Sequence, residues 1–214
     1  MIRVSLGGPG LAGFPPDFAG GYVKLMLAPA TAGGKPVVRT YTIRHQAEDA
    51  IAIDFALHGG EAAGPATRWP KPLPQGRDFY LVAGDMTALP AIGVNLEALP
   101  ADARGFAAIE IQDERDRQDI AAPEGVEIAW LVNPEPGQRP ALLVDALRSA
   151  ARPEGSLTAW AACEFSAMKR LREYLRGELA LAPADLYLSS YWKHGMIEDE
   201  HKLAKQQDAA AQPS

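Results

Sequence analysis

The chain has a single cysteine, no long apolar run and no excess of positive charge. Because Cys163 is the only cysteine among 214 residues, neither an intrachain disulfide nor a cysteine-based zinc site can form. The four histidines are scattered, and the spacing between His194 and His201 fits no common zinc motif. We therefore expect no metal site built by the protein itself.

Charge and hydropathy exclude two further classes of protein. The formal net charge is -6, and no run of Lys or Arg interrupts it, which argues against a nucleic-acid-binding surface. No apolar run is long enough to span a membrane, and no signal peptide is recognisable. With 47% hydrophobic and 22% charged residues the composition is that of a globular protein. We expect a cytoplasmic monomer that binds neither nucleic acid nor membrane.

The first part of the chain carries the pattern of β structure. Short apolar or alternating runs are separated by stretches rich in Gly and Pro, which predicts an antiparallel barrel or sandwich. A Pro-rich connector, Arg68–Arg77, follows and is expected to act as a linker. The four predicted strands are Ile2–Leu6, Tyr22–Leu27, Val37–Arg44 and Ile51–Leu57.

Strands and helices alternate after the linker, which predicts a parallel sheet with helical crossovers. The expected fold class is therefore a two-part α+β chain, an antiparallel β-barrel followed by an α/β parallel-sheet domain. We place the boundaries at 1–76, 77–197 and a tail at 198–214, which can begin as a helix and end in disorder. The predicted strands are Phe79–Ala83, Phe106–Ile111, Glu127–Leu131, Leu157–Cys163 and Asp185–Ser190, and the predicted helices are Thr87–Leu99, Pro140–Ala151 and Glu164–Leu179.

The segment that joins the first of these strands to its helix is a candidate phosphate site. Gly84 and Asp85 follow the strand, Thr87 is placed to cap the helix, and Pro90 is tolerable in its first turn. Unpaired N–H groups and the positive end of the helix dipole at such a turn suit nucleotide phosphates. A single Gly turn is equally consistent with an ordinary strand–turn–helix unit.

A barrel followed by a nucleotide-type half is the plan of flavin reductases, and Arg39–Thr42 is the strongest flavin candidate in the barrel. On a strand, Arg39 and Tyr41 point one way while Thr40 and Thr42 point the other. Arg offers a bidentate fork for phosphate, and Tyr offers a flat face for a ring. The alternative is a plain strand with a surface Arg and a cross-strand Tyr.

Six segments, in order along nearly the whole chain, resemble the siderophore-interacting proteins. These are FAD-dependent ferric-siderophore reductases of the ferredoxin-reductase superfamily. The segments are Arg-x-Tyr-Thr-x-Arg (39–44), Asp-Phe-x-x-His-Gly (54–59), Gly-Pro-Ala-Thr-x-Trp (64–69), Ala-Gly-Asp-Met-Thr-Ala-Leu-Pro-Ala-Ile (83–92), Trp-Ala-Ala-Cys-Glu (160–164) with the Arg-rich helix start that follows, and Tyr-Trp-Lys-x-Gly (191–195).

The resemblance implies an FAD site in the first half and an NADH or NADPH site in the second. The residues implied to contact FAD are Arg39, Thr40, Tyr41, Thr42, Asp54, Phe55, His58, Gly64, Ala66, Thr67, Trp69, Tyr191 and Trp192. Those implied to contact NAD(P)H are Gly84, Asp85, Thr87, Ala88, Asp113 and Glu164. Core or surface positions remain the alternative for His58, and aromatic core packing for Tyr191 and Trp192.

Two acidic residues need a specific interpretation. A carboxylate beside a phosphate is repulsive, so Asp85 is expected to cap the helix or to hold ribose or nicotinamide. Asp113 can accept ribose hydroxyls, which favours NADH, whereas nearby Arg115 and Arg117 favour a ribose phosphate. The choice between NADH and NADPH stays open.

The implied reaction passes a hydride from NAD(P)H to FAD and single electrons onward to Fe(III). Fe(II) binds hard oxygen donors more weakly, so iron is released from the siderophore. No protein acid or base is needed, and no catalytic residue is nominated. Ferric siderophores are often anionic, so cations are expected near the flavin: Lys24, Arg44 and Lys193. The alternatives are a flavin- or siderophore-binding protein without turnover, and a general NAD(P)H:flavin reductase.

The sequence departs from the family pattern at three places. Only four barrel strands are present where the superfamily has six, so we expect residues to be missing ahead of Met1 and near Trp69–Asp78. Cys163 stands where the family has Gly, and its side chain either crowds the nicotinamide or packs as a simple substitution.

Overall fold

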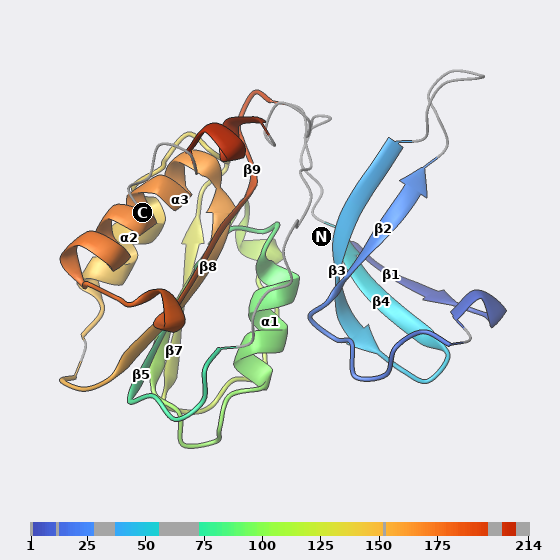
Figure 1. Ribbon diagram of the computed structural model, residues 1–214, viewed down its shortest axis with the longest axis horizontal. Coiled ribbons are helices and arrows are strands. Elements are labelled where there is room, and N and C mark those ends of the chain that lie inside the picture. The colour runs from blue at the N-terminus through green and yellow to red at the C-terminus, as the bar shows by residue number, and fades with distance from the viewer. Residues whose placement is uncertain are drawn as a thin grey trace.

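The computed structural model describes residues 2–11, 13–27, 37–55, 73–151, 153–196 and 203–208. In Figure 1 two sheets lie side by side, with helix α1 on the side of the larger sheet that faces the smaller one. The order of secondary structure follows the prediction of a β half and then an α/β half.

The first half is a four-stranded antiparallel sheet with the order β1-β4-β3-β2. All four predicted strands are confirmed. Where this half is described, its buried core consists of Ile43, Ile51 and Ile53, flanked by partly buried rings and aliphatic side chains. Within the described residues no ladder joins β1 to β2. The strands are β1 (Ile2–Gly7), β2 (Tyr22–Leu27), β3 (Val37–Gln46) and β4 (Ala50–Phe55), and a short 3-10 turn occupies Pro9–Leu11.

The second half is a five-stranded sheet with the order β7-β6-β5-β8-β9, and every ladder in it is parallel. Helix α1 covers one face, and α2 and α3 cover the other (Figure 1). The strands are β5 (Phe79–Gly84), β6 (Gly105–Ile111), β7 (Val126–Val132), β8 (Leu157–Glu164) and β9 (Leu186–Trp192); the helices are α1 (Leu89–Glu97), α2 (Leu142–Ser149) and α3 (Phe165–Arg172), with short helical turns at Glu114–Asp116 and Pro183–Asp185.

The predicted helices are present, but their ends differ. Helix α1 begins at Leu89, because Thr87 hydrogen-bonds to the Asp85 side chain and lies in the preceding turn. The last predicted helix divides at Arg172 into α3 and a π-helical turn, Glu173–Glu178, so its hydrogen-bond pattern changes midway. The spacing of apolar side chains in the sequence does not distinguish a continuous α-helix from an α-helix that ends in a π-helical turn.

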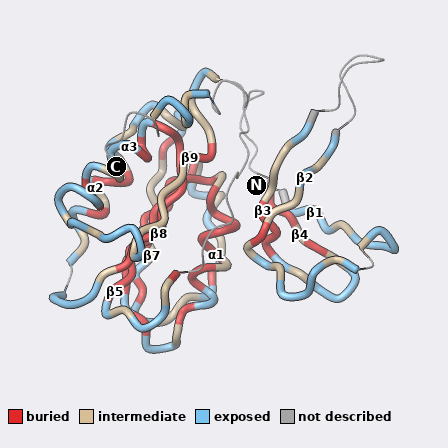
Figure 2. Tube along the Cα trace, viewed as in Figure 1, coloured by how far each residue is buried: buried red, intermediate tan, exposed pale blue. Residues whose placement is uncertain are grey.

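The core lies around the parallel sheet (Figure 2). Every residue of β5 and β6 is buried, as expected for central strands covered on both faces. Helix α1 is also buried almost all round, with only Val94 and Glu97 partly open or exposed. A helix buried on all sides must have a second neighbour besides its own sheet.

Part of the tail is described as a helical turn at residues 203–208. Asp208 forms an ion pair with Arg172 of α3 at 2.5 Å, and the Lys205 ammonium donates to the Ser190 carbonyl of β9 at 2.8 Å. The tail therefore docks on the second half of the chain, beside the end of β9. None of the described helices is long and apolar enough to cross a membrane.

Candidate functional site

Polar side chains gather at the carboxyl edge of the parallel sheet, within an otherwise apolar core. Asp85 follows β5, Glu110 lies near the end of β6, and Asn133 follows β7. Glu164 and Trp192 end β8 and β9. Ligands of open α/β sheets bind outside this edge, so it is the candidate site of the second half.

Asp85 joins three segments of the chain through its carboxylate. Oδ1 accepts from the Thr87 backbone N–H at 2.9 Å and from the Thr87 hydroxyl at 2.5 Å. Oδ2 accepts from the Glu164 backbone N–H and from the Trp192 indole, each at 2.8 Å. Burial raises the pKa of Asp85, and these donors act against that rise. Asp85 therefore orders the turn before α1. The helix itself begins after Ala88 without a side-chain cap, so neither Asp85 nor Thr87 caps it as expected.

Glu164 has a similar structural role at the end of β8. Its Oε2 accepts from the Ser166 N–H at 2.5 Å and from the Ala167 N–H at 3.2 Å, which caps α3. Its Oε1 accepts from the His194 N–H at 3.2 Å. The side chain is buried, and its oxygens serve the start of α3 and the turn after β9.

Glu110 is a buried acid that forms no ion pair with any of the described residues. Its Oε1 accepts from the Asn133 amide at 2.7 Å. Burial first, and then the nearby Asp85 carboxylate, raises the pKa of Glu110 to about 7. Burial also raises the pKa of the Cys163 thiol, which has no exposed surface, so a packing role fits this substitution.

The loop between β7 and α2 reaches across the same edge to the segment after β9, although these strands lie at opposite sides of the sheet. Gly137 has a φ of +81°, and a Cβ there would lie 3.1 Å from Cη2 of Trp192 and 3.0 Å from Cβ of His194. The Gln138 amide lies 3.4 Å from Nε2 of His194. We call this contact the clasp; it packs against one side of Trp192.

Gly84 has a packing role in the structure. It is the last residue of β5 and has no positive φ. A Cβ at this position would lie 2.5 Å from the Ala162 carbonyl oxygen and 3.0 Å from the Cβ of Ala88. The missing side chain thus lets β5 approach β8 and the α1 turn, and the turn itself begins at Asp85. Ala88 is buried beneath that turn.

The described flavin candidates of the first half lie on β3 and β4. Tyr41 is partly buried on the same side of β3 as Ile43, and its ring lies 4.3 Å from that of Phe55. Strand alternation puts Arg39 on that side as well, and Thr40 and Thr42 on the other. A cation and a flat ring on one side of one strand fit a phosphate joined to a flat ring system.

Asp54 is held inside the first sheet by an arginine. Arg3 lies opposite it in the β1–β4 ladder and donates from Nε at 2.6 Å and from Nη2 at 2.7 Å. The Asp54 carboxylate is buried. This bidentate pair joins β1 to β4, which gives Asp54 a structural function whether or not it also contacts FAD.

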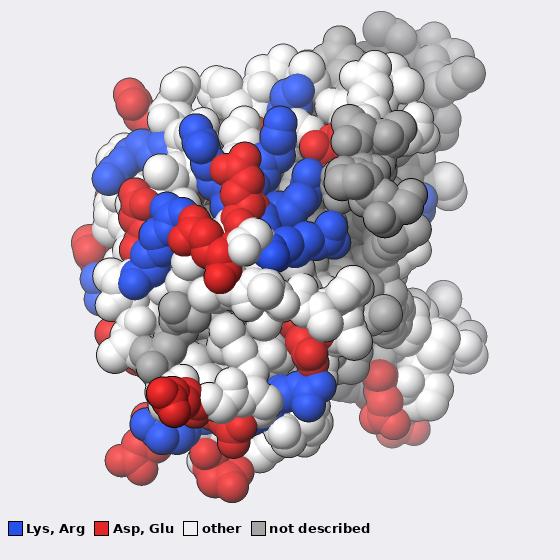
Figure 3. Space-filling model, turned by 60° about the vertical axis from the view of Figure 1, so that its left-hand side comes forward, with Lys and Arg blue, Asp and Glu red and all other residues white. Residues whose placement is uncertain are grey.

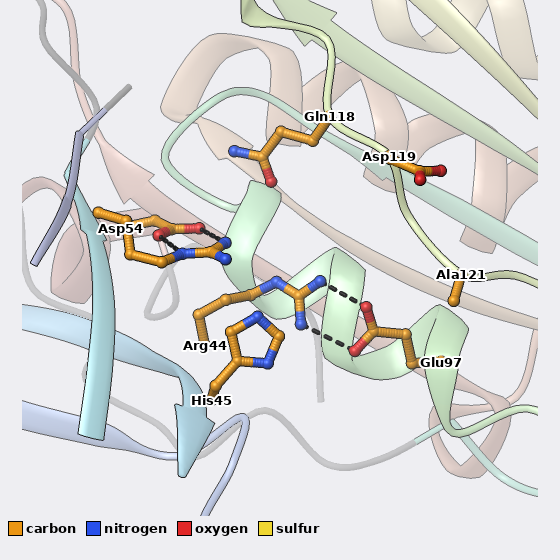
Figure 4. Close-up of a pocket in the computed structure, with 8 residues that line it drawn as sticks. Arg44, His45, Asp54, Glu97, Gln118, Asp119 and Ala121 are labelled. Atoms are coloured by element: carbon orange, nitrogen blue, oxygen red, sulfur yellow. Dashed lines mark hydrogen bonds and ion pairs between the residues drawn. The ribbon is translucent and has the colours of Figure 1, made fainter. Parts of the chain in front are cut away.

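The two halves meet where β3 crosses α1. Arg44 of β3 is buried and donates from Nη1 to Glu97 Oε2 at 2.8 Å and from Nη2 to Oε1 at 2.5 Å. Beside this pair lies a cavity of about 510 Å³ lined from both halves (Figure 4). Its lining residues are Arg3, Arg44, His45, Asp54, Glu97, Gln118, Asp119 and Ala121.

The three cations expected to attract a siderophore are not brought together. Arg44 is paired with Glu97 and buried, which does not fit the expectation of an exposed substrate-binding cation. Lys24 is exposed on β2, and Lys193 lies over the Phe165 ring at 4.8 Å in the other half. On the face that carries α2 and α3, Lys and Arg are interspersed with Asp and Glu (Figure 3).

Asp113 is also engaged within the protein. It caps the turn after β6 by accepting from the Arg115 N–H at 2.9 Å, and it pairs with the Arg115 guanidinium at 2.7 Å. These bonds lower the pKa of Asp113 to about 2. Arg117 pairs with Glu114 in the same turn. The sequence left the choice between NADH and NADPH open because Asp113 and the two arginines favour different donors. In the structure each of these charges is paired with a neighbour in the turn.

Five implied FAD residues lie outside the described residues: His58, Gly64, Ala66, Thr67 and Trp69. Tyr191, by contrast, is buried in the core under α1, and Trp192 is bound to Asp85 at the edge. Sequence reasoning missed Glu110, Asn133 and His194. Glu110 could have been found from the sequence, because it is a charged residue within the apolar strand Gly105–Ile111.

Comparisons with known proteins agree on one family. A model described as siderophore-interacting FAD-binding domain matches residues 29–86, and one described as siderophore-interacting protein matches residues 77–195. The ferric vibriobactin reductase ViuB of Vibrio cholerae is 32% identical over 94% of this chain and 87% of its own length. An uncharacterized protein of Mycobacterium tuberculosis is 32% identical over 262 residues, covering 99% of this chain and 92% of its own length.

That alignment is longer than this chain of 214 residues, so the mycobacterial relative contains segments that this chain lacks. Among solved structures, the siderophore-interacting protein SipS of Aeromonas hydrophila has a TM-score of 0.81 at 33% identity, covering 98% of this chain and 92% of SipS. An FAD-bound flavohemoglobin of Malassezia yamatoensis, at 13% identity and a TM-score of 0.54, shares the fold alone. The chain belongs to the siderophore-interacting protein family, and its first half matches that family's FAD-binding domain.

Proposed function

We propose that this protein is an FAD-dependent reductase that passes electrons from NADH or NADPH to the ferric iron of a siderophore. The observation that carries the proposal is the position of the carboxyl edge of the parallel sheet. Helix α1 starts at that edge and contacts the FAD-type sheet through Arg44 and Glu97. Helix α1 would thus connect a donor bound at this edge to a flavin bound on the first sheet.

FAD fits the described part of the first half. Arg39 would hold phosphate, and the Tyr41 ring would lie along the flat part of the cofactor. Thr40 and Thr42, on the other side of β3, offer hydroxyls for hydrogen bonds. Trp192, fixed by Asp85, supplies an aromatic surface from the second half. When bound, FAD supplies a ring that accepts a hydride and releases electrons one at a time.

NADH or NADPH is proposed to bind at the carboxyl edge of the parallel sheet. Thr87 and Ala88 form the turn at the start of α1, whose dipole favours negative charge. Asp85 and Glu164 are engaged by backbone and indole N–H groups, so they shape the site by holding its loops. The chain's contribution to the reaction is to bind and orient both partners, and no described group is required to move a proton.

A binding protein without turnover is the second candidate function. The observation in its favour is that Arg44 is buried and Lys24 and Lys193 lie in separate halves, so no described cluster of free cations marks a site for an anionic siderophore. Such a protein would hold flavin or siderophore and would not oxidise NADH or NADPH in the presence of a ferric siderophore.

The test is anaerobic mixing of the flavin-loaded protein with NADH and, separately, with NADPH. We expect the flavin absorbance to bleach with one donor, and a ferric siderophore to restore it while Fe(II) appears in a ferrous chelator. A yellow protein that neither donor bleaches would contradict the reductase and favour the binding protein. Transfer to free FAD at the same rate as to the siderophore would favour a general flavin reductase.

A further inference from the structure

The contact between the two halves is built around one arginine. Arg44 of β3 reaches α1, where its two Nη atoms bond to the two carboxylate oxygens of Glu97. The Arg44 side chain is 4% exposed and that of Glu97 is 31% exposed. A two-point bond between a planar guanidinium and a carboxylate fixes orientation as well as distance.

Gly93 makes room for that arginine one turn earlier on α1. A Cβ at Gly93 would lie 2.9 Å from three guanidinium atoms of Arg44: Cζ, Nε and Nη2. The flat group therefore lies directly on the helix backbone, and its Nε is buried without a partner in the described residues. An unpaired buried donor has a free-energy cost, which the close fit and the Glu97 pair must offset.

A second close approach supports the same contact. Gly20, in the loop before β2, has a φ of +81°, and a Cβ there would lie 3.0 Å from Cγ1 of Val94. The same loop is tied to β3, because the Gly20 N–H donates to the Ile43 carbonyl at 2.8 Å. Residues 93, 94 and 97 of α1 thus all meet the first half. We call this contact the joint.

The location of the joint bears on the reaction. Helix α1 begins at the turn where the donor is proposed to bind and ends at Glu97. We infer that Arg44 is a positioning residue, which, through Gly93 and Glu97, sets the orientation of the flavin half relative to the donor half. This inference rests on the proposed function, because orientation matters only if a hydride passes between the halves. A misplacement of about 1 Å can slow such a transfer 100-fold.

Two variants loosen the joint in different ways. Gly93→Ala places a methyl group where the guanidinium lies and leaves both charges in place, and alanine is the better helix former. Glu97→Gln removes the charge from a partly exposed side chain and preserves its shape. Arg44→Lys keeps the positive charge but loses the planar guanidinium and its two-point bond to Glu97. We expect its rate of flavin reduction to lie between that of wild type and those of the other two variants.

The matched control is Arg77→Met. Arg77 bonds to Asp185 at 3.0 Å and 2.5 Å, and the two side chains are 34% and 25% exposed. This pair lies within the second half, so its loss leaves the joint intact. A general loss of stability from removing a partly buried ion pair would affect Arg77→Met as well.

The experiment follows reduction of the bound flavin by the donor in a single turnover. For Gly93→Ala and Glu97→Gln we expect the limiting rate to fall roughly 10- to 100-fold. Flavin content, donor Kd and reoxidation by the ferric siderophore should stay as in wild type and in Arg77→Met. Limiting rates equal to wild type in both variants would overturn the inference, as would an equal fall in the control.

A readout independent of catalysis completes the test. Solution scattering should show a larger radius of gyration for both variants, and amide exchange should be faster around Gly93, whereas Arg77→Met should match wild type. Unchanged scattering and exchange would overturn the inference. If neither donor reduces the wild-type flavin, the proposed function fails while these measurements still decide whether the joint fixes the two halves. If Gly93→Ala does not fold, Glu97→Gln decides.

Discussion

Glu110 is an acid whose ionisation in the folded protein is opposed by its surroundings. It lies on β6, between β5 and β7, with the Asp85 and Glu164 carboxylates and the Arg139 guanidinium acting on its charge. Its pKa rises from 4.5 to about 7, so the folded state holds a proton that the unfolded chain releases at lower pH. Stability associated with Glu110 is therefore complete below pH 4.5 and is lost as the pH rises through 7.

We expect Glu110→Gln to remove this dependence. The glutamine oxygen can still accept from Asn133, and no charge forms, so at pH 8 the variant should be more stable than wild type by up to about 3 kcal/mol. Urea denaturation between pH 5 and pH 8 measures the difference. Glu127→Gln, at an exposed position of β7, is the control. A difference between Glu110→Gln and wild type that stays constant across the pH range would contradict the prediction.

At the scale of the element, the clasp is a contact between loops from the two outer strands of the sheet. The β7–α2 loop can approach Trp192 and His194 this closely because Gly137 has no side chain. The same indole donates to Asp85 on its polar edge. Trp192 is therefore fixed both by a hydrogen bond and by the backbone of a loop from the far edge.

Replacing Gly137 with alanine should disturb this element. The residue would have to adopt a φ of +81° and make contacts of 3.0–3.2 Å, so we expect a loss of about 2 kcal/mol and a shift of the Trp192 indole N–H resonance. Gly177→Ala is the control, since nothing lies within 4 Å of its Cβ position and its φ is ordinary. That control should be neutral or more stable by up to about 1 kcal/mol. An unshifted indole resonance in Gly137→Ala would show that the clasp does not hold Trp192.

Strand positions were predictable from the sequence, whereas helix ends and side-chain partners were not. Alternation and apolar runs mark all nine strands of the described part of the chain, because burial sets those patterns directly. The start of α1 depends on a hydrogen bond between Thr87 and Asp85, and Asp85 in turn depends on Trp192, 107 residues later. Arg44 was predicted as a substrate-binding cation because its long-range partner, Glu97, carries no sequence signal.

At the scale of the whole molecule, the two halves differ in how much core they contain. Among the described residues of the first half the buried core is three isoleucines, whereas apolar clusters fill both faces of the parallel sheet in the second. A small core rarely stabilises an isolated sheet. The second half should therefore fold on its own, and the first should depend on its contact with α1.

A fragment of residues 73–208 tests this difference. We expect it to unfold cooperatively in urea and to give dispersed amide resonances, because both of its core clusters remain complete. A fragment of residues 1–72 should lack dispersed resonances. An unfolded 73–208 fragment would show that the first half contributes stability that its small core does not suggest, and would move the domain boundary proposed near residue 77.

Helix α1 has nine residues and is therefore about 14 Å long. Over that length a buried helix does not bend appreciably, so its two ends move together. One end is the turn that Asp85 orders, and the other carries Glu97. A small tilt caused by a molecule arriving at the turn would displace the guanidinium of Arg44, and the first sheet with it, by a comparable amount. Movement at the turn would thus pass to the first half through α1 alone, with no other described element needed in between.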